Sequence, residues 1–125
     1  MKQKKIPNNI KLSSTDIDAI ICALPLVANI EAPNPKQTDW NRINCNIATN
    51  KLLTGNPIFS VDELRVISVA IAVALDVISG TGDVIVAEAG VDAEWKAKLS
   101  RHLFVYTRLD SLFGELSERI QRKLK

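Results

Sequence analysis

The sequence predicts an all-α fold, a small bundle of four to five helices around one central apolar helix at about Val61–Ser79. The chain has 125 residues, of which 46% are hydrophobic but only 5% aromatic, so we expect a mainly aliphatic core, as in packed helices. Two segments support this prediction. A strongly apolar segment in the middle of the chain has both a start and a stop signal for a helix, and an apolar helical period extends over residues 93–123.

Residues 1–12 are predicted to form a flexible basic arm, and residues 13–125 a single helical-bundle domain. The arm contains four lysines, no acidic residue and Pro7, a composition that discourages regular structure. Formal charge is +4 over residues 1–12, −7 over residues 13–94 and +5 over residues 95–125, which leaves +2 in total. A net charge this small does not by itself indicate a polyanionic partner.

The first helix is expected to begin near Ser14 or Thr15, where a hydroxyl cap precedes Asp16 and Asp18. Its apolar body covers residues 17–30. Pro25 lies inside this body, lacks a backbone N–H and crowds the preceding turn. We expect a kink at this proline rather than the end of the helix.

The second helix is predicted at residues 39–54, with Thr38 as its cap and Gly55 after its end. It contains four asparagines, which are poor residues for a helix interior. The simplest explanation is that Trp40, Ile43 and Ile47, which share a helical spacing, pack into the core. The alternative is a polar site that the asparagines line.

The central helix has the clearest boundaries in the chain. Ser60 and Glu63 form a capping box, and Gly80 suits the left-handed residue that closes a helix. Between these marks only one narrow stripe is polar or small, so most of the circumference should be buried. The stripe consists of Arg65, Ser68, Ala72, Asp76 and Ser79.

Residues 81–92 are expected to form a short helix or an irregular loop, and a long helix is expected over residues 93–123. One face of that helix is apolar and includes His102, Tyr106 and, at its border, Asp110. A histidine, a phenol and a carboxylate at four-residue steps have the chemistry for proton transfer. The alternative is that His102 has no catalytic role and is a core histidine whose hydrogen bond is satisfied.

The other face of the last helix combines arginines with aliphatic side chains, a composition found in protein interfaces. These are the candidate partner-binding residues: Arg101, Val105, Arg108, Leu112, Arg119 and Arg122. The same arginines could contact phosphates. In the alternative interpretation, Val105, Leu112 and Phe104 pack beneath another helix or the N-terminal arm while the arginines are simply solvated.

Known motifs are missing from the sequence. It has no phosphate-binding glycine loop and no nucleophile elbow. One histidine and two distant cysteines, Cys22 and Cys45, do not form a zinc-binding set, so we expect no cofactor and no metal. No apolar run is long enough to cross a membrane and no signal peptide is evident. A cytoplasmic protein with reduced thiols is therefore expected, and a structural disulfide between Cys22 and Cys45 is the alternative.

The main functional hypothesis is a non-enzymatic protein-protein interaction or regulatory protein, acting as a homo-oligomer or as a binder of another protein through its C-terminal helix. The alternative is an accessory nucleic-acid-binding protein that uses its basic termini. A third hypothesis is an enzyme based on His102, Tyr106 and Asp110.

Overall fold

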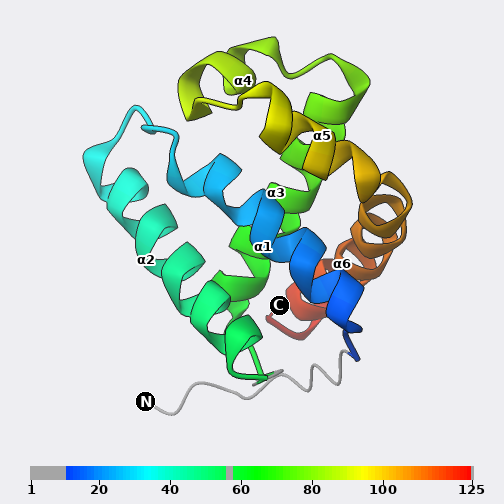
Figure 1. Ribbon diagram of the computed structural model, residues 1–125. Helices are drawn as coiled ribbons and strands as arrows, with labels where there is room; N and C mark the ends of the chain where they lie inside the picture. Colours follow the sequence, from blue (N-terminus) through cyan, green and yellow to red (C-terminus); the bar gives the residue numbers. More distant parts are fainter. Residues whose placement is uncertain (1–10, 56–57, 125) are drawn as a thin grey trace.

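The computed structural model describes residues 11–55 and 58–124, and over these residues all regular secondary structure is helical (Figure 1). The all-α prediction is confirmed. The described residues form six helices instead of four or five: α1 (Ser14–Ala28), α2 (Pro35–Leu53), α3 (Val61–Ser79), α4 (Asp83–Ala89), α5 (Ala93–Arg101) and α6 (Leu103–Leu124). Most of the predicted basic arm lies outside the described residues, as do the side chains of residues 117 and 119–124.

Helix α1 begins at Ser14, within the predicted start, but its cap is Ser13 and not Ser14 or Thr15. The Ser13 hydroxyl accepts from the Asp16 amide at 3.1 Å, and the Ser13 amide donates to the Asp16 carboxylate at 3.0 Å, which completes a capping box. The helix continues through Pro25 to Ala28, so the expectation that the proline does not end it is confirmed.

Helix α2 begins earlier than predicted, and Thr38 is not its cap. The Asn34 side chain accepts from the Lys36 amide at 3.0 Å, and Pro35 occupies the first helical position, where its missing N–H costs nothing. Thr38 is buried instead. Its hydroxyl accepts from the Ala32 amide at 2.8 Å and so secures the loop before the helix.

The buried face of α2 is not the face that its large apolar residues predict. The buried residues are Thr38, Asn44, Cys45, Ala48 and Leu52. Ile43 and Ile47 are 56% and 40% exposed, so the prediction that they pack into the core is wrong, while Trp40 is half-buried. Small side chains at positions 45 and 48 allow α2 to approach its neighbours closely, which favours that face.

Helix α3 has the predicted boundaries. The Ser60 hydroxyl accepts from the Glu63 amide at 3.1 Å, and Gly80 has a φ of 85°, a left-handed conformation that glycine adopts without strain. Helix α3 contacts each of the other five helices, and α1, α2 and α6 lie around it in Figure 1.

The prediction of one long C-terminal helix over residues 93–123 is wrong, because the helix is interrupted at His102. The His102 amide donates to the Leu99 carbonyl at 3.0 Å, a short-range bond that closes α5 before α6 begins. The break lets α5 lie against α1 and α3 while α6 follows α3 in another direction (Figure 1). Over the described residues no single helix has both the length and the hydropathy of a membrane span. Only α3 and α4 together do, and the chain bends by 113° between them.

Candidate functional site

The six predicted partner-binding residues do not form one face directed away from the core. Arg101, Arg108 and Leu112 are exposed. Val105 is half-buried and packs against the core, which differs from its predicted outward position. The side chains of Arg119 and Arg122 lie outside the described part of the chain. The described candidates therefore lie along the flank of α6 and at the end of α5.

Arg108 connects α6 to the start of α1. Its guanidinium donates to the Asp16 carboxylate, which is 3% exposed, while the Arg108 side chain is 58% exposed. The same carboxylate also accepts from the Ser13 amide. Arg108 therefore supports packing through one side of its guanidinium and still presents surface to solvent.

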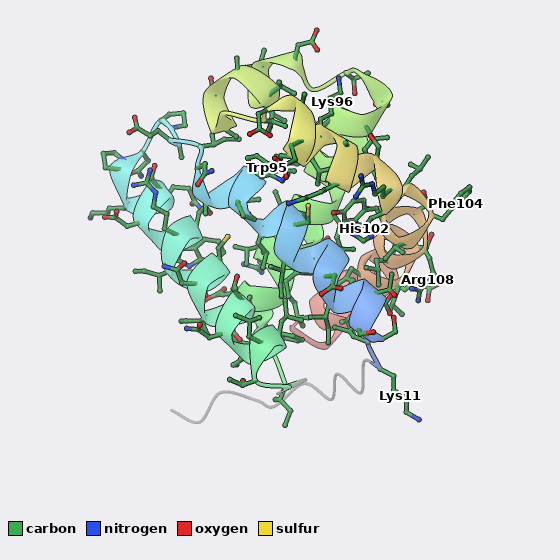
Figure 2. All side chains as sticks on the ribbon, viewed as in Figure 1. Lys11, Trp95, Lys96, His102, Phe104 and Arg108 are labelled. Carbon is green, nitrogen blue, oxygen red and sulfur yellow. The ribbon has the colours of Figure 1, made fainter. Side chains whose placement is uncertain are left out.

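The most exposed aromatic residue at this surface is Phe104, which is 86% exposed. Figure 2 shows it projecting from the edge of the molecule, close to where α5 ends at His102. Phe104, Arg108 and Leu112 follow one another at four-residue steps, so they lie on one side of α6. We call these three residues the Phe104 stripe. Leu112 is 38% exposed, as is Leu103 beside the helix break. The alternative interpretation in which Phe104 packs beneath another segment is therefore wrong, and only the structure identifies this residue as exposed.

His102, Tyr106 and Asp110 do not assemble a proton-transfer site. The rings of His102 and Tyr106 are 6.0 Å apart and edge to face. The Tyr106 side chain is fully buried, and its hydroxyl donates to the Ala19 carbonyl of α1 at 2.7 Å. Burial raises the pKa of Tyr106, and the neighbouring Cys22 adds to this effect. Asp110 is exposed. The phenol thus has a structural partner and stays protonated at neutral pH.

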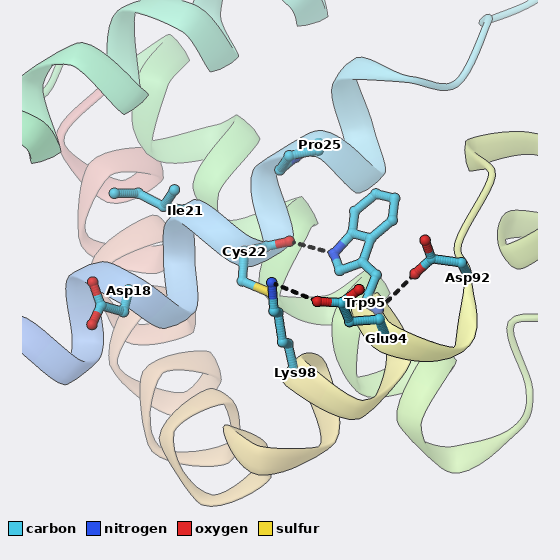
Figure 3. A pocket seen from close by; sticks show the side chains of 8 residues that line it. All are labelled: Asp18, Ile21, Cys22, Pro25, Asp92, Glu94, Trp95 and Lys98. Atoms are coloured by element: carbon cyan, nitrogen blue, oxygen red, sulfur yellow. Dashed lines mark hydrogen bonds and ion pairs between the residues drawn. The ribbon is translucent and has the colours of Figure 1, made fainter.

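A depression of about 420 Å³ lies between α1 and α5 (Figure 3). The Trp95 indole donates to the Cys22 carbonyl at 2.9 Å, next to the helical turn where Pro25 provides no amide donor. Lys98 pairs with Glu94 at 3.6 Å. Burial raises the pKa of the Cys22 thiol, so this cysteine is a weak nucleophile at neutral pH. The Trp95 hydrogen bond fastens α5 to α1, whereas the Lys98–Glu94 pair lies within α5.

Neither Cys22 nor Cys45 forms a disulfide bond. Cys45 is buried in the core, and its thiol donates to the Leu24 carbonyl at 3.8 Å. Burial raises its pKa to about 11. Among the described residues, no group of three or more histidine, cysteine or acidic side chains is arranged to hold a metal ion.

A larger groove, of about 830 Å³, separates α2 from the first half of α3. Trp40, Asn41 and Lys36 line its α2 side, and Arg65 and Val69 line its α3 side. Val69 is 51% exposed. Of the four asparagines noted within the second helix, only Asn41 lines this groove, so the asparagines do not jointly form its wall.

No family model, curated protein or solved structure matches this chain.

Proposed function

We propose that this chain is a non-enzymatic, cytoplasmic interaction or regulatory protein that binds another protein on the C-terminal helices. The observation that carries the proposal is the 86% exposure of Phe104 in line with Arg108 and Leu112. In this proposal α3 is the packing centre of the bundle. Helix α6 therefore buries one side against α3 and presents its other side to a partner.

The chemistry of the Phe104 stripe favours docking. Covering an exposed phenylalanine side chain contributes about 1.5–3 kcal/mol, and aromatic and arginine residues are the commonest energetic anchors of protein interfaces. Two further exposed aliphatic residues, Leu103 and Leu112, adjoin this anchor. A partner could therefore bury several apolar side chains at this site.

Charge favours a different protein over a second copy on this surface. Arg101 makes no ion pair with a described residue, and Arg108 is partly exposed beside its ion pair with Asp16. Two identical copies would bring these arginines near one another, which is repulsive. The expected partner segment has an apolar residue that covers Phe104 and carboxylates that face the arginines.

The test is site-specific photo-crosslinking in the cells that produce the protein, with the photoreactive residue at Phe104 or, as control, at Val84. Val84 is also an exposed apolar residue, at 69%, but lies on α4. We expect a discrete protein adduct from position 104 and none from position 84. With the purified partner, Phe104→Ala should weaken binding by about 10-fold or more, whereas Val84→Ala should not. Equal affinity of both variants would contradict the proposal.

Nucleic acid is the second candidate ligand, because Arg101 lies close in sequence to an exposed ring on which a base could stack. If nucleic acid is the ligand, the photoreactive residue at position 104 should crosslink to RNA or DNA, and binding should weaken steeply with salt. A crosslinked adduct that nuclease digests would support nucleic acid as the ligand and contradict the protein partner.

A further inference from the structure

Helix α2 has a second helical stripe on its outer side. Positions 36, 40, 43, 47, 50 and 54 alternate steps of four and three residues, the spacing of a coiled-coil seam. Its middle consists of Trp40, Ile43, Ile47 and Asn50, which we call the α2 seam. Ile43 is 56% exposed, Ile47 is 40% exposed, and Asn50 is also exposed. The stripe is distinct from the buried α2 face at positions 38, 45, 48 and 52.

The length of this surface matches that of a standard interface. At 1.5 Å per residue, the 19 residues of α2 extend about 28 Å. A standard interface covers about 800 Å² on each partner, which corresponds to a square patch with edges of about 28 Å. The seam provides the length, and the groove between Trp40 and the exposed Val69 of α3 adds width.

We infer that two copies of this chain pair through their α2 seams, antiparallel and about a two-fold axis. In this register Ile43 of one copy lies against Ile47 of the other, and Trp40 lies opposite Asn50. The proposal is independent of the Phe104 stripe, which is on α6. It assigns self-association to one surface and partner binding to another.

The polar groups of the seam are complementary in this register. The Trp40 indole N–H makes no hydrogen bond to a described residue, and the Asn50 side chain makes none either. Opposite one another, the indole can donate to the amide oxygen at both ends of the interface. Asn46, exposed on the flank of the seam, meets its own copy near the axis, and an amide can both donate to and accept from an identical amide.

Charge favours a second copy and the antiparallel direction. Between positions 37 and 50 the seam contains no charged residue, so two identical surfaces meet without repulsion at the axis. Arg42 is directed elsewhere, since its guanidinium donates to the Ala28 carbonyl at 3.0 Å. A parallel pair would place Lys36 against Lys36 and align the helix dipoles, both of which are unfavourable. The antiparallel pair places Lys36 opposite Thr54.

The experiment is the solution mass over a concentration series, by light scattering and sedimentation equilibrium. We expect the native chain to reach twice its 13.8 kDa mass. Ile43→Glu and Ile47→Lys should each weaken dimerisation by about 100-fold or more, because each places a charge against an apolar side chain. Both positions are exposed, so helicity and thermal unfolding should remain close to native.

Mixing the two variants tests the register directly. In the antiparallel pair the introduced glutamate of one copy faces the introduced lysine of the other, so an equimolar mixture should recover the dimer. In a parallel pair the two charges do not meet, and the mixture stays monomeric, which overturns the register. Phe104→Glu is the matched control and should leave the dimer intact. A native chain that is monomeric throughout overturns the proposal without affecting partner binding. A dimer that only Phe104→Glu dissociates overturns it as well, and would assign self-association to the Phe104 stripe.

Discussion

Arg108 and Asp16 are separated by 92 residues in sequence, and a double-mutant cycle can measure how strongly their ion pair couples α6 to α1. The Asp16 carboxylate is 3% exposed and the Arg108 side chain 58% exposed. The pair therefore lies between surface pairs, worth about 0.2–1 kcal/mol, and buried pairs, whose disruption costs about 3–5 kcal/mol. We expect a coupling free energy of about 1–2 kcal/mol.

The cycle compares Asp16→Ala, Arg108→Ala and the double variant by urea unfolding. Asp16→Ala should cost more than Arg108→Ala, because it also removes the acceptor for the Ser13 amide and so the capping box of α1. Arg108→Ala leaves a buried carboxylate with less compensation, which should lower the free energy of unfolding by about 1–3 kcal/mol. The capping contribution cancels in the cycle, since it is lost in both branches that lack Asp16.

A coupling below about 0.3 kcal/mol would refute this reasoning, because that is the error range for independent sites. Arg108 would then be free to act only as a surface residue. A coupling of the expected size would mean that Arg108→Ala is unsuitable for mapping partner binding, since it also loosens α1. Phe104→Ala would then remain the appropriate probe of the Phe104 stripe.

Two further predictions concern buried polar groups. Burial alone would raise the pKa of Glu63, but hydrogen bonds from Lys51 and Ser60 outweigh it and leave this pKa below its ordinary value. The stabilisation is therefore present above the unfolded-state pKa of about 4.3 and is lost as pH falls below it. In urea unfolding at both pH values, the native chain should lose more stability than Glu63→Gln between pH 7 and about pH 3, and equal losses would contradict the assignment. Tyr106→Phe removes the 2.7 Å bond to the Ala19 carbonyl and should lower the free energy of unfolding by about 1–2 kcal/mol. An unchanged unfolding midpoint would show that this bond contributes nothing.

The sequence by itself determined the features whose hydrogen bonds are local. The ends of α3 follow from Ser60 and Glu63 at one end and Gly80 at the other, since these groups satisfy backbone atoms within a few residues of themselves. The all-α class follows equally from local capping and from the helical period of the apolar residues. The caps of α1 and α2 were misplaced because several hydroxyl and amide side chains compete at each of those starts.

The tertiary structure decided which of two apolar stripes on α2 is buried. Trp40, Ile43 and Ile47 are larger than Cys45 and Ala48, so hydrophobicity alone favours the wrong face. The buried face is the one whose small side chains fit beneath neighbouring helices, and that fit depends on residues distant in sequence. For the same reason only the structure reveals the exposed α2 seam.

Some features of the candidate site could also be predicted from the sequence, and others only from the structure. The sequence could predict that Arg108 and Leu112 share one side of the last helix, because they are four residues apart. It did not predict the exposure of Phe104. The break at His102, the half-buried position of Val105 and the pairing of Arg108 with Asp16 could not be predicted either. A helix break and a long-range ion pair depend on contacts with residues distant in sequence. Those contacts cannot be predicted from the local segment alone.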